Sequence, residues 1–125
     1  MKTKYIPGVC NIGPAEIKMR ERVGWYALGA TALLGIVLVA SDAPEWSKVV
    51  LFFPATVSAL GFLQAWFHFC VAYGTQGLFN VSDAVAKTES ISQKEFRKKD
   101  QQRSIMIIVS AVVIGMVITA SAFAS

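Results

Sequence analysis

Charge is scarce in this sequence, and that scarcity decides the class of protein. Only 16% of the 125 residues are charged, whereas globular domains usually carry about a quarter. The apolar residues, 54% of the chain, are gathered in three long blocks instead of alternating with polar ones. Residues 105–122 contain no charge at any point around a helix, so they cannot form a surface helix of a soluble domain. The sequence therefore predicts an all-α membrane protein.

Histidine and cysteine are also rare, which narrows the possible chemistry. His68 is the single histidine, and a haem bound there would need a second axial ligand from another span, where only Met106 and Met116 are available. Cys10 and Cys70 form no CxxC pair, and a zinc site built from them and His68 would lack a fourth ligand. Without an acid/base or nucleophile constellation, the sequence predicts no metal site, no catalytic residue and no enzyme.

Three segments are long enough to cross a bilayer, which takes roughly 20 apolar residues in a helix. They are predicted at about 23–40, 49–72 and 104–123. Residues 41–48 are too few for a domain, so the first two spans are expected to form an antiparallel hairpin. Pro54 removes one backbone hydrogen bond inside the second span and could bend it, unless a neighbour satisfies the freed carbonyl.

The polar segments divide the chain into a cytoplasmic tail, 1–22, and a single transmembrane domain, 23–125, that includes a cytoplasmic link at 73–103. Pro14 suits the first position of a helix, and Glu16 and Arg20 are spaced for an ion pair along it. In the link, Ser92 and Glu95 have the spacing of a capping box. A helix is therefore predicted to start near Ser92 and to continue unbroken into the third span.

Lysine and arginine are distributed unevenly, and their distribution predicts the orientation. Five lie in the tail, six in the second link and one, Lys48, in the first link. Because positive charge accumulates on the cytoplasmic side, the tail and the second link are predicted to be cytoplasmic and the C-terminus to lie outside.

Two stripes of small residues recur every four positions and suit close helix packing. They are Ala27, Thr31 and Gly35 in the first span, and Ala111, Gly115 and Thr119 in the third.

The tail contains glycines, prolines, Cys10 and Asn11 in addition to its basic residues. The basic residues alone would be enough to set the topology, so the others are expected to have a further role. Residues 5–13 are predicted to fold against the cytoplasmic ends of the spans near 73–80, or against a partner there. Cys10, Asn11 and Gly13 are the candidate docking residues, with Asn11 or the Gly8 to Gly13 amides making polar contacts.

A second basic group lies just before the third span and is suited to anionic lipid headgroups. Its members are Arg97, Lys98, Lys99 and Arg103. Glu95 and Asp100 are interleaved with them and Phe96 is the single aromatic nearby, so no nucleic-acid partner is predicted.

The segments YIPGVCNIGPAEI and FHFCVAYGTQGLFN resemble parts of a group of small, uncharacterised bacterial inner-membrane proteins. The resemblance covers about a fifth of the chain. It implies a compact multi-span protein of the bacterial inner membrane and supplies no catalytic residue.

These observations favour a non-enzymatic accessory or scaffold subunit, whose partners would be membrane lipid and other membrane proteins or further copies of itself, with no cofactor. The alternative is a redox or transport component that uses His68 and Gln64, four residues apart, to contact haem or a quinone. An ionisable group within a span is a functional candidate. A structural role, in which the histidine bonds to a neighbouring carbonyl, would equally explain the presence of His68.

Overall fold

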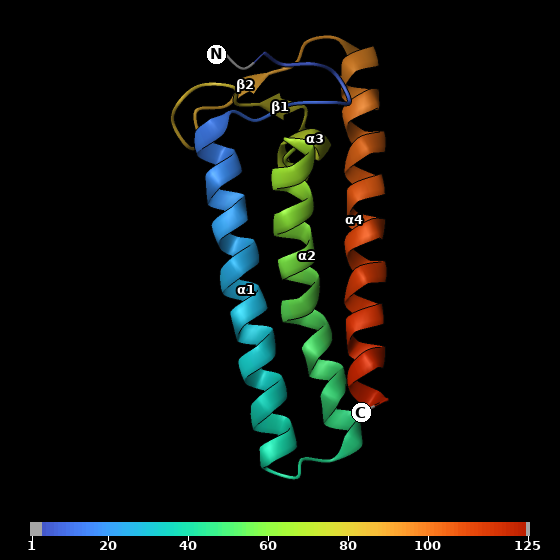
Figure 1. Ribbon diagram of the computed structural model, residues 1–125. Coiled ribbons are helices and arrows are strands. Elements are labelled where there is room, and N and C mark those ends of the chain that lie inside the picture. Colours follow the sequence, from blue (N-terminus) through green and yellow to red (C-terminus); the bar gives the residue numbers. More distant parts are fainter. Residues whose placement is uncertain (1–3, 125) are drawn as a thin grey trace.

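The computed structural model describes residues 4–124 and consists mainly of three long helices (Figure 1). Helix α1 is Pro14–Ala40, the 3-10 helix η1 (Glu45–Leu51) leads into α2 (Phe52–Phe67), and α4 is Lys94–Phe123. The short helix α3 (Val71–Gln76) is followed by strands β1 (Leu78–Phe79) and β2 (Glu89–Ser90), which pair antiparallel. Helix α1, η1 with α2, and α4 are each long and apolar enough to cross a membrane. The predicted all-α class with three spans is confirmed; Lys2 of the tail and Ser125 lie outside the described residues.

The three long helices form a row, because α2 packs extensively against both α1 and α4 and lies between them (Figure 1). Little of the apolar surface is covered as a result. In the most apolar part of each helix, 17% of residues are buried in α1, 28% in η1 with α2, and 22% in α4. A small core lies where α2, α3 and α4 meet and is formed by Phe69, Val71 and Ile107.

The second span is shorter than the sequence predicts, because the helix ends at Phe67 instead of residue 72. His68 adopts the left-handed conformation with φ 54°, which is uncommon for residues other than glycine, although histidine adopts it more often than most. The backbone amides after the break find partners on Gln64. Its carbonyl accepts the Phe69 N–H at 3.0 Å, and its side-chain oxygen accepts the Val71 N–H at 2.9 Å. Phe69 is thereby placed in the core, fully buried.

Other helix ends agree in part with the sequence. Helix α1 starts at Pro14 as predicted and is continuous to Ala40. The prediction of a capping box at Ser92 and Glu95 was wrong. Helix α4 starts at Lys94, its N-cap residue is Gln93, and no side chain of the described residues caps its first turn. Pro54 is the third residue of α2, and the carbonyl of residue 50 that it frees accepts the N–H of Phe52 where the 3-10 helix ends.

Candidate functional site: a polar cap and a pocket at opposite ends of the helices

The N-terminal segment 4–13 and residues 68–93 fold together over one end of the helices (Figure 1); we call this region the cap. Residues 11–13 run beside Asn80, whose N–H donates to the Asn11 carbonyl and whose carbonyl accepts the Gly13 N–H, both at 2.8 Å. The Asn11 side chain is fully buried and bonds to the backbone of Cys70. The segment therefore lies against the ends of α2, α3 and β1, close to the region 73–80.

Glu16, in the first turn of α1, connects most parts of the cap. Its side chain is fully buried and pairs with Arg20 at 2.7 Å, as the spacing of the two residues predicted. The other carboxylate oxygen accepts the Ala86 N–H at 2.8 Å, the Tyr73 hydroxyl at 3.2 Å and an Asn80 amide N–H at 3.4 Å. One carboxylate thus holds α1, α3 and the loop between the strands together. Sequence reasoning found the ion pair and missed the other three partners, which are 57 to 70 residues away.

Asp100, on α4, joins the N-terminal segment to that helix. The buried carboxylate accepts the Tyr5 hydroxyl at 2.8 Å and the Gly8 N–H at 2.7 Å, while Arg103 donates to the Gly8 carbonyl at 2.9 Å. Gly8 has φ 71°, and a Cβ there would lie 3.2 Å from the Lys99 Cβ, so glycine fits best. Burial, with the hydrogen bond to Asp100, raises the pKa of Tyr5 well above its ordinary value.

Two of the four residues predicted to bind lipid headgroups have partners within the protein. Arg97 donates to the Ile91 carbonyl, and Arg103, besides bonding Gly8, lies with its guanidinium over the Phe67 ring. Lys98 and Lys99 are exposed. The basic group is therefore divided between residues that hold the cap and residues that face outward.

His68 and Gln64 have different environments. The His68 side chain is exposed, and its carbonyl accepts the Asn11 N–H at 3.1 Å. The side-chain oxygen of Gln64 holds the first amide of α3. Both cysteines are buried and free; the Cys70 sulfur accepts from Arg20 at 2.8 Å. Within residues 4–124, no three His, Cys, Asp or Glu side chains are grouped closely enough to hold a metal ion.

The stripe on α4 is buried along its whole length: Ala111, Gly115 and Thr119 are all covered, and a Cβ on Gly115 would collide with the Thr56 hydroxyl of α2. The stripe on α1 is covered less evenly. Thr31 is buried and bonds the Ala27 carbonyl, but a Cβ on Gly35 would approach no closer than 3.9 Å to Leu51.

A tight contact between α1 and α2 involves residues that sequence reasoning missed. A Cβ on Gly61 would lie 2.8 Å from the Gly24 backbone nitrogen, and the Ser58 hydroxyl donates to the Gly24 carbonyl at 2.8 Å. The available signal was Gly24 itself, which stands three residues before Ala27 and so extends the same stripe toward the cap.

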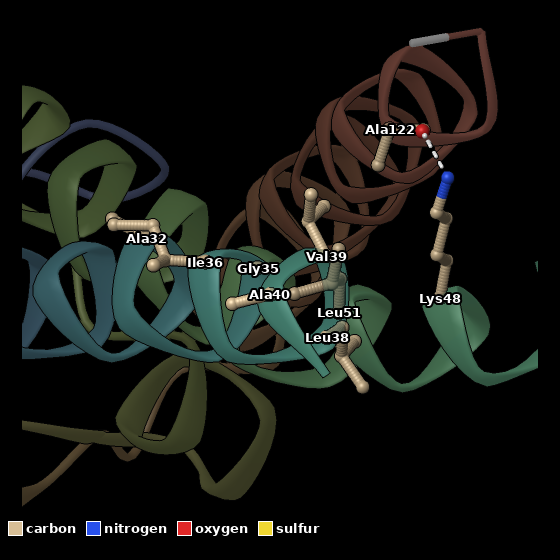
Figure 2. A pocket seen from close by; sticks show the side chains of 9 residues that line it. All are labelled: Ala32, Gly35, Ile36, Leu38, Val39, Ala40, Lys48, Leu51 and Ala122. Carbon is tan, nitrogen blue, oxygen red and sulfur yellow. Dashed lines mark hydrogen bonds between the residues drawn. The ribbon is translucent and has the colours of Figure 1, made fainter. Parts of the chain in front are cut away.

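A pocket of 480 Å³ lies at the other end of the row, between the ends of α1 and α4 and η1 (Figure 2). Its lining is mostly apolar, and Gly35 forms part of it. Among residues 4–124, Lys48 is the one charged residue in the lining. Its ammonium donates to the Ala122 carbonyl at 3.1 Å, near the negative end of the α4 dipole.

The architecture is that of an all-α membrane protein with three helices able to span a bilayer, capped at one end by a fold of loops and short elements. No family model, curated protein or solved structure matches the chain.

Proposed function

We propose that the protein is a non-enzymatic accessory or scaffold subunit of the bacterial inner membrane, which packs into a larger membrane complex or self-associates. In this arrangement the cap and N-terminus are cytoplasmic and the C-terminus is outside. The orientation rests on the basic residues of the tail and of the link before α4.

The observation that carries the proposal is the row of helices. With α2 between α1 and α4, no more than 28% of the residues in any of the three apolar stretches are buried within the described chain. At Gly29 of α1 a Cβ would meet no atom of the described chain within 4 Å, so the backbone of another helix can approach α1 closely there. A protein with so much apolar surface and so little mass outside the membrane is suited to side-by-side assembly.

One face of α2 offers a specific place for a partner. A shallow groove of 880 Å³ runs along it, and its mostly apolar lining includes three large aromatic residues, Trp25, Phe62 and Trp66. His68 also lines this groove. The Trp25 and Phe62 rings meet edge to face with centroids 5.2 Å apart, whereas Trp66 is 81% exposed. Aromatic side chains are enriched at protein interfaces, so this groove is the surface that we expect a neighbouring subunit to cover.

The experiment is to extract the full chain from its native membrane with its lipid, without detergent, and to measure the mass of the particles by native mass spectrometry. We expect assemblies heavier than the 13.6 kDa chain, and we expect a Trp66→Ala variant to shift them toward the monomer. The matched control is Val109→Ala, an exposed apolar residue of α4 outside the groove. Single chains with lipid alone in the wild type would contradict the proposal.

The redox or transport alternative keeps a simple test. A visible absorption spectrum of the purified protein with a Soret band that is lost in His68→Ala would replace the scaffold proposal. The Gln64 side chain is already occupied by the Val71 amide, so we favour the scaffold.

A further inference from the structure

Lys48 is buried at the end of the helices opposite the cap, although it is the only lysine or arginine between residues 23 and 86. Only 10% of its side chain is exposed. It projects from η1 toward the end of α4, where the ammonium meets the Ala122 carbonyl (Figure 2). A buried cation is costly unless an anion and hydrogen-bond acceptors surround it.

Among the described residues, the acid that pairs with Lys48 is Glu45, whose side chain is exposed. Both oxygens of Glu45 lie near the Lys48 nitrogen, at 3.2 and 3.3 Å, and 72% of the Glu45 side chain is exposed. A lysine ammonium has three donors, and a carboxylate has about four acceptor positions. The three donors of the ammonium are thus directed to the Ala122 carbonyl and to the two Glu45 oxygens. Glu45 is exposed and holds Lys48 through two oxygens, so it can give up one of these contacts and still accept on its exposed side.

Apolar surface begins directly beside this pair of charges. The pocket that Lys48 lines extends along Ile36, Val39 and Leu51, and its volume of 480 Å³ is within the range of about 300–1,000 Å³ usual for sites of small molecules. Trp46, 73% exposed, stands two residues from Lys48, and tryptophan prefers the headgroup level of a bilayer. The site thus has one buried cation, one exposed anion and an adjoining apolar pocket.

We propose that this pocket binds one molecule of a zwitterionic phospholipid whose headgroup carries a phosphate and a primary ammonium. The phosphate takes the place of one Glu45 oxygen on the Lys48 ammonium, and the lipid ammonium donates to the exposed side of Glu45. An acyl chain covers Ile36, Val39 and Leu51. The two opposite charges of the site match the two charges of such a headgroup. An anionic headgroup that took the place of a Glu45 oxygen on Lys48 would bring no cation for the Glu45 carboxylate, and a quaternary ammonium could not donate a hydrogen bond to it.

The test uses the full chain reconstituted in nanodiscs that contain equal amounts of phosphatidylethanolamine, phosphatidylglycerol and phosphatidylcholine. Lipid that stays bound after mild delipidation is identified and counted by native mass spectrometry. We expect phosphatidylethanolamine to be retained roughly tenfold over each of the other two, since a hydrogen bond to a charged group contributes about that much. Lys48→Gln and Glu45→Gln are each expected to abolish the preference.

A second variant tests the pocket without touching the charges. In Gly35→Leu the new side chain has room to enter the pocket, because a Cβ there meets only Leu51 at 3.9 Å, and we expect it to reduce retention of every lipid. The control is Gly29→Leu on the same helix, where a Cβ would meet no atom of the described chain within 4 Å; it should retain lipid as the wild type does.

Equal retention of the three lipids by the wild type would overturn the inference, as would retention unchanged in both Lys48→Gln and Gly35→Leu. A preference for phosphatidylglycerol that increases in Glu45→Gln would also overturn it and would assign the pocket to anionic lipid. The readout is bound lipid per chain, so it is independent of the oligomeric state that tests the proposed function.

Discussion

The side chain of Asn11 pairs with both backbone groups of Cys70. Its oxygen accepts the Cys70 N–H at 2.6 Å, and its nitrogen donates to the Cys70 carbonyl at 3.1 Å. Cys70 is the residue where the chain is extended, between the end of α2 and the start of α3. An amide side chain of the N-terminal segment thus takes the place that a neighbouring strand would have. It supplies the acceptor for the Cys70 N–H and a second donor for the Cys70 carbonyl, which also accepts the Gly74 N–H of α3 at 2.9 Å.

Replacing Asn11 by alanine is expected to destabilise the cap by roughly 1–3 kcal/mol, because the buried Cys70 N–H loses its partner and an unsatisfied buried group costs that much. The Cys70 carbonyl keeps a partner, since it also accepts the Gly74 N–H at 2.9 Å. Hydrogen exchange of residues 68–76 in detergent micelles measures this loss. Val9→Ala, at a half-exposed position of the same segment, is the control and should leave the exchange rates nearly unchanged. Unaltered protection in Asn11→Ala would mean that water replaces the side chain.

Glu16→Ala is expected to release the loop between β1 and β2. The substitution removes the partner of the Ala86 N–H and leaves Arg20, whose side chain is 11% exposed, without its anion; breaking a buried pair in this way costs about 3–5 kcal/mol. Limited proteolysis at residues 81–88 should become faster. Glu21→Ala, an exposed acid on the same helix, is the comparison, and equal cleavage of both variants would show that the loop does not depend on Glu16.

The parts of this fold that depend on composition could be predicted, and those that depend on distant polar pairs could not. Uncharged runs identify the spans because the bilayer requires them, and Pro14 marks the start of α1. The break at His68 has no such signal, since residues 62–72 contain neither glycine nor proline. The break is stabilised by Asn11, which is 59 residues from Cys70, and sequence spacing contains no information on that contact.

Gly115→Leu is expected to separate α4 from α2, because even a Cβ at this position would collide with the Thr56 hydroxyl. Overpacking a tight contact usually costs about 1–3 kcal/mol. The midpoint temperature of thermal unfolding in detergent should fall accordingly. Val117→Leu, at a 60% exposed site two residues away, should leave this midpoint nearly unchanged. Equal midpoints for the two variants would mean that the helices can move apart without a loss of stability.

Cys10 is expected to react slowly with a water-soluble maleimide in the folded protein. The thiolate is the reactive form, and burial raises the pKa of this thiol above 9.0. The folded state therefore holds the proton more strongly than the unfolded state does. This contribution to stability is complete below pH 9.0 and is lost as the pH rises from 9.0 through the raised value.

The measurement uses a Cys70→Ser background, so that Cys10 is the one thiol present. Labelling is followed in inside-out vesicles below pH 9.0 and again after denaturation. We expect protection that disappears on denaturation. Labelling at the rate of a free thiol in the native protein would show that the N-terminal segment leaves the cap readily in the membrane.

The proposed orientation predicts the behaviour of two reporter fusions. A reporter active only outside the cytoplasm should be active when fused after Ser125 and silent when fused after Asp83, because eleven of the twelve basic residues are in segments assigned to the cytoplasm. The reverse pattern would refute the orientation.

The two ends of the row of helices are held together very differently. At the cap, Asn11, Glu16 and Asp100 connect segments far apart in the chain through many hydrogen bonds. At the other end, Lys48 makes the polar contact between η1 and α4, beside a pocket instead of a filled core. The free energy needed to separate α4 from its neighbours should therefore be lowest at that end. A lipid or a helix of another protein would insert between the helices from there, while the hydrogen bonds of the cap stay intact.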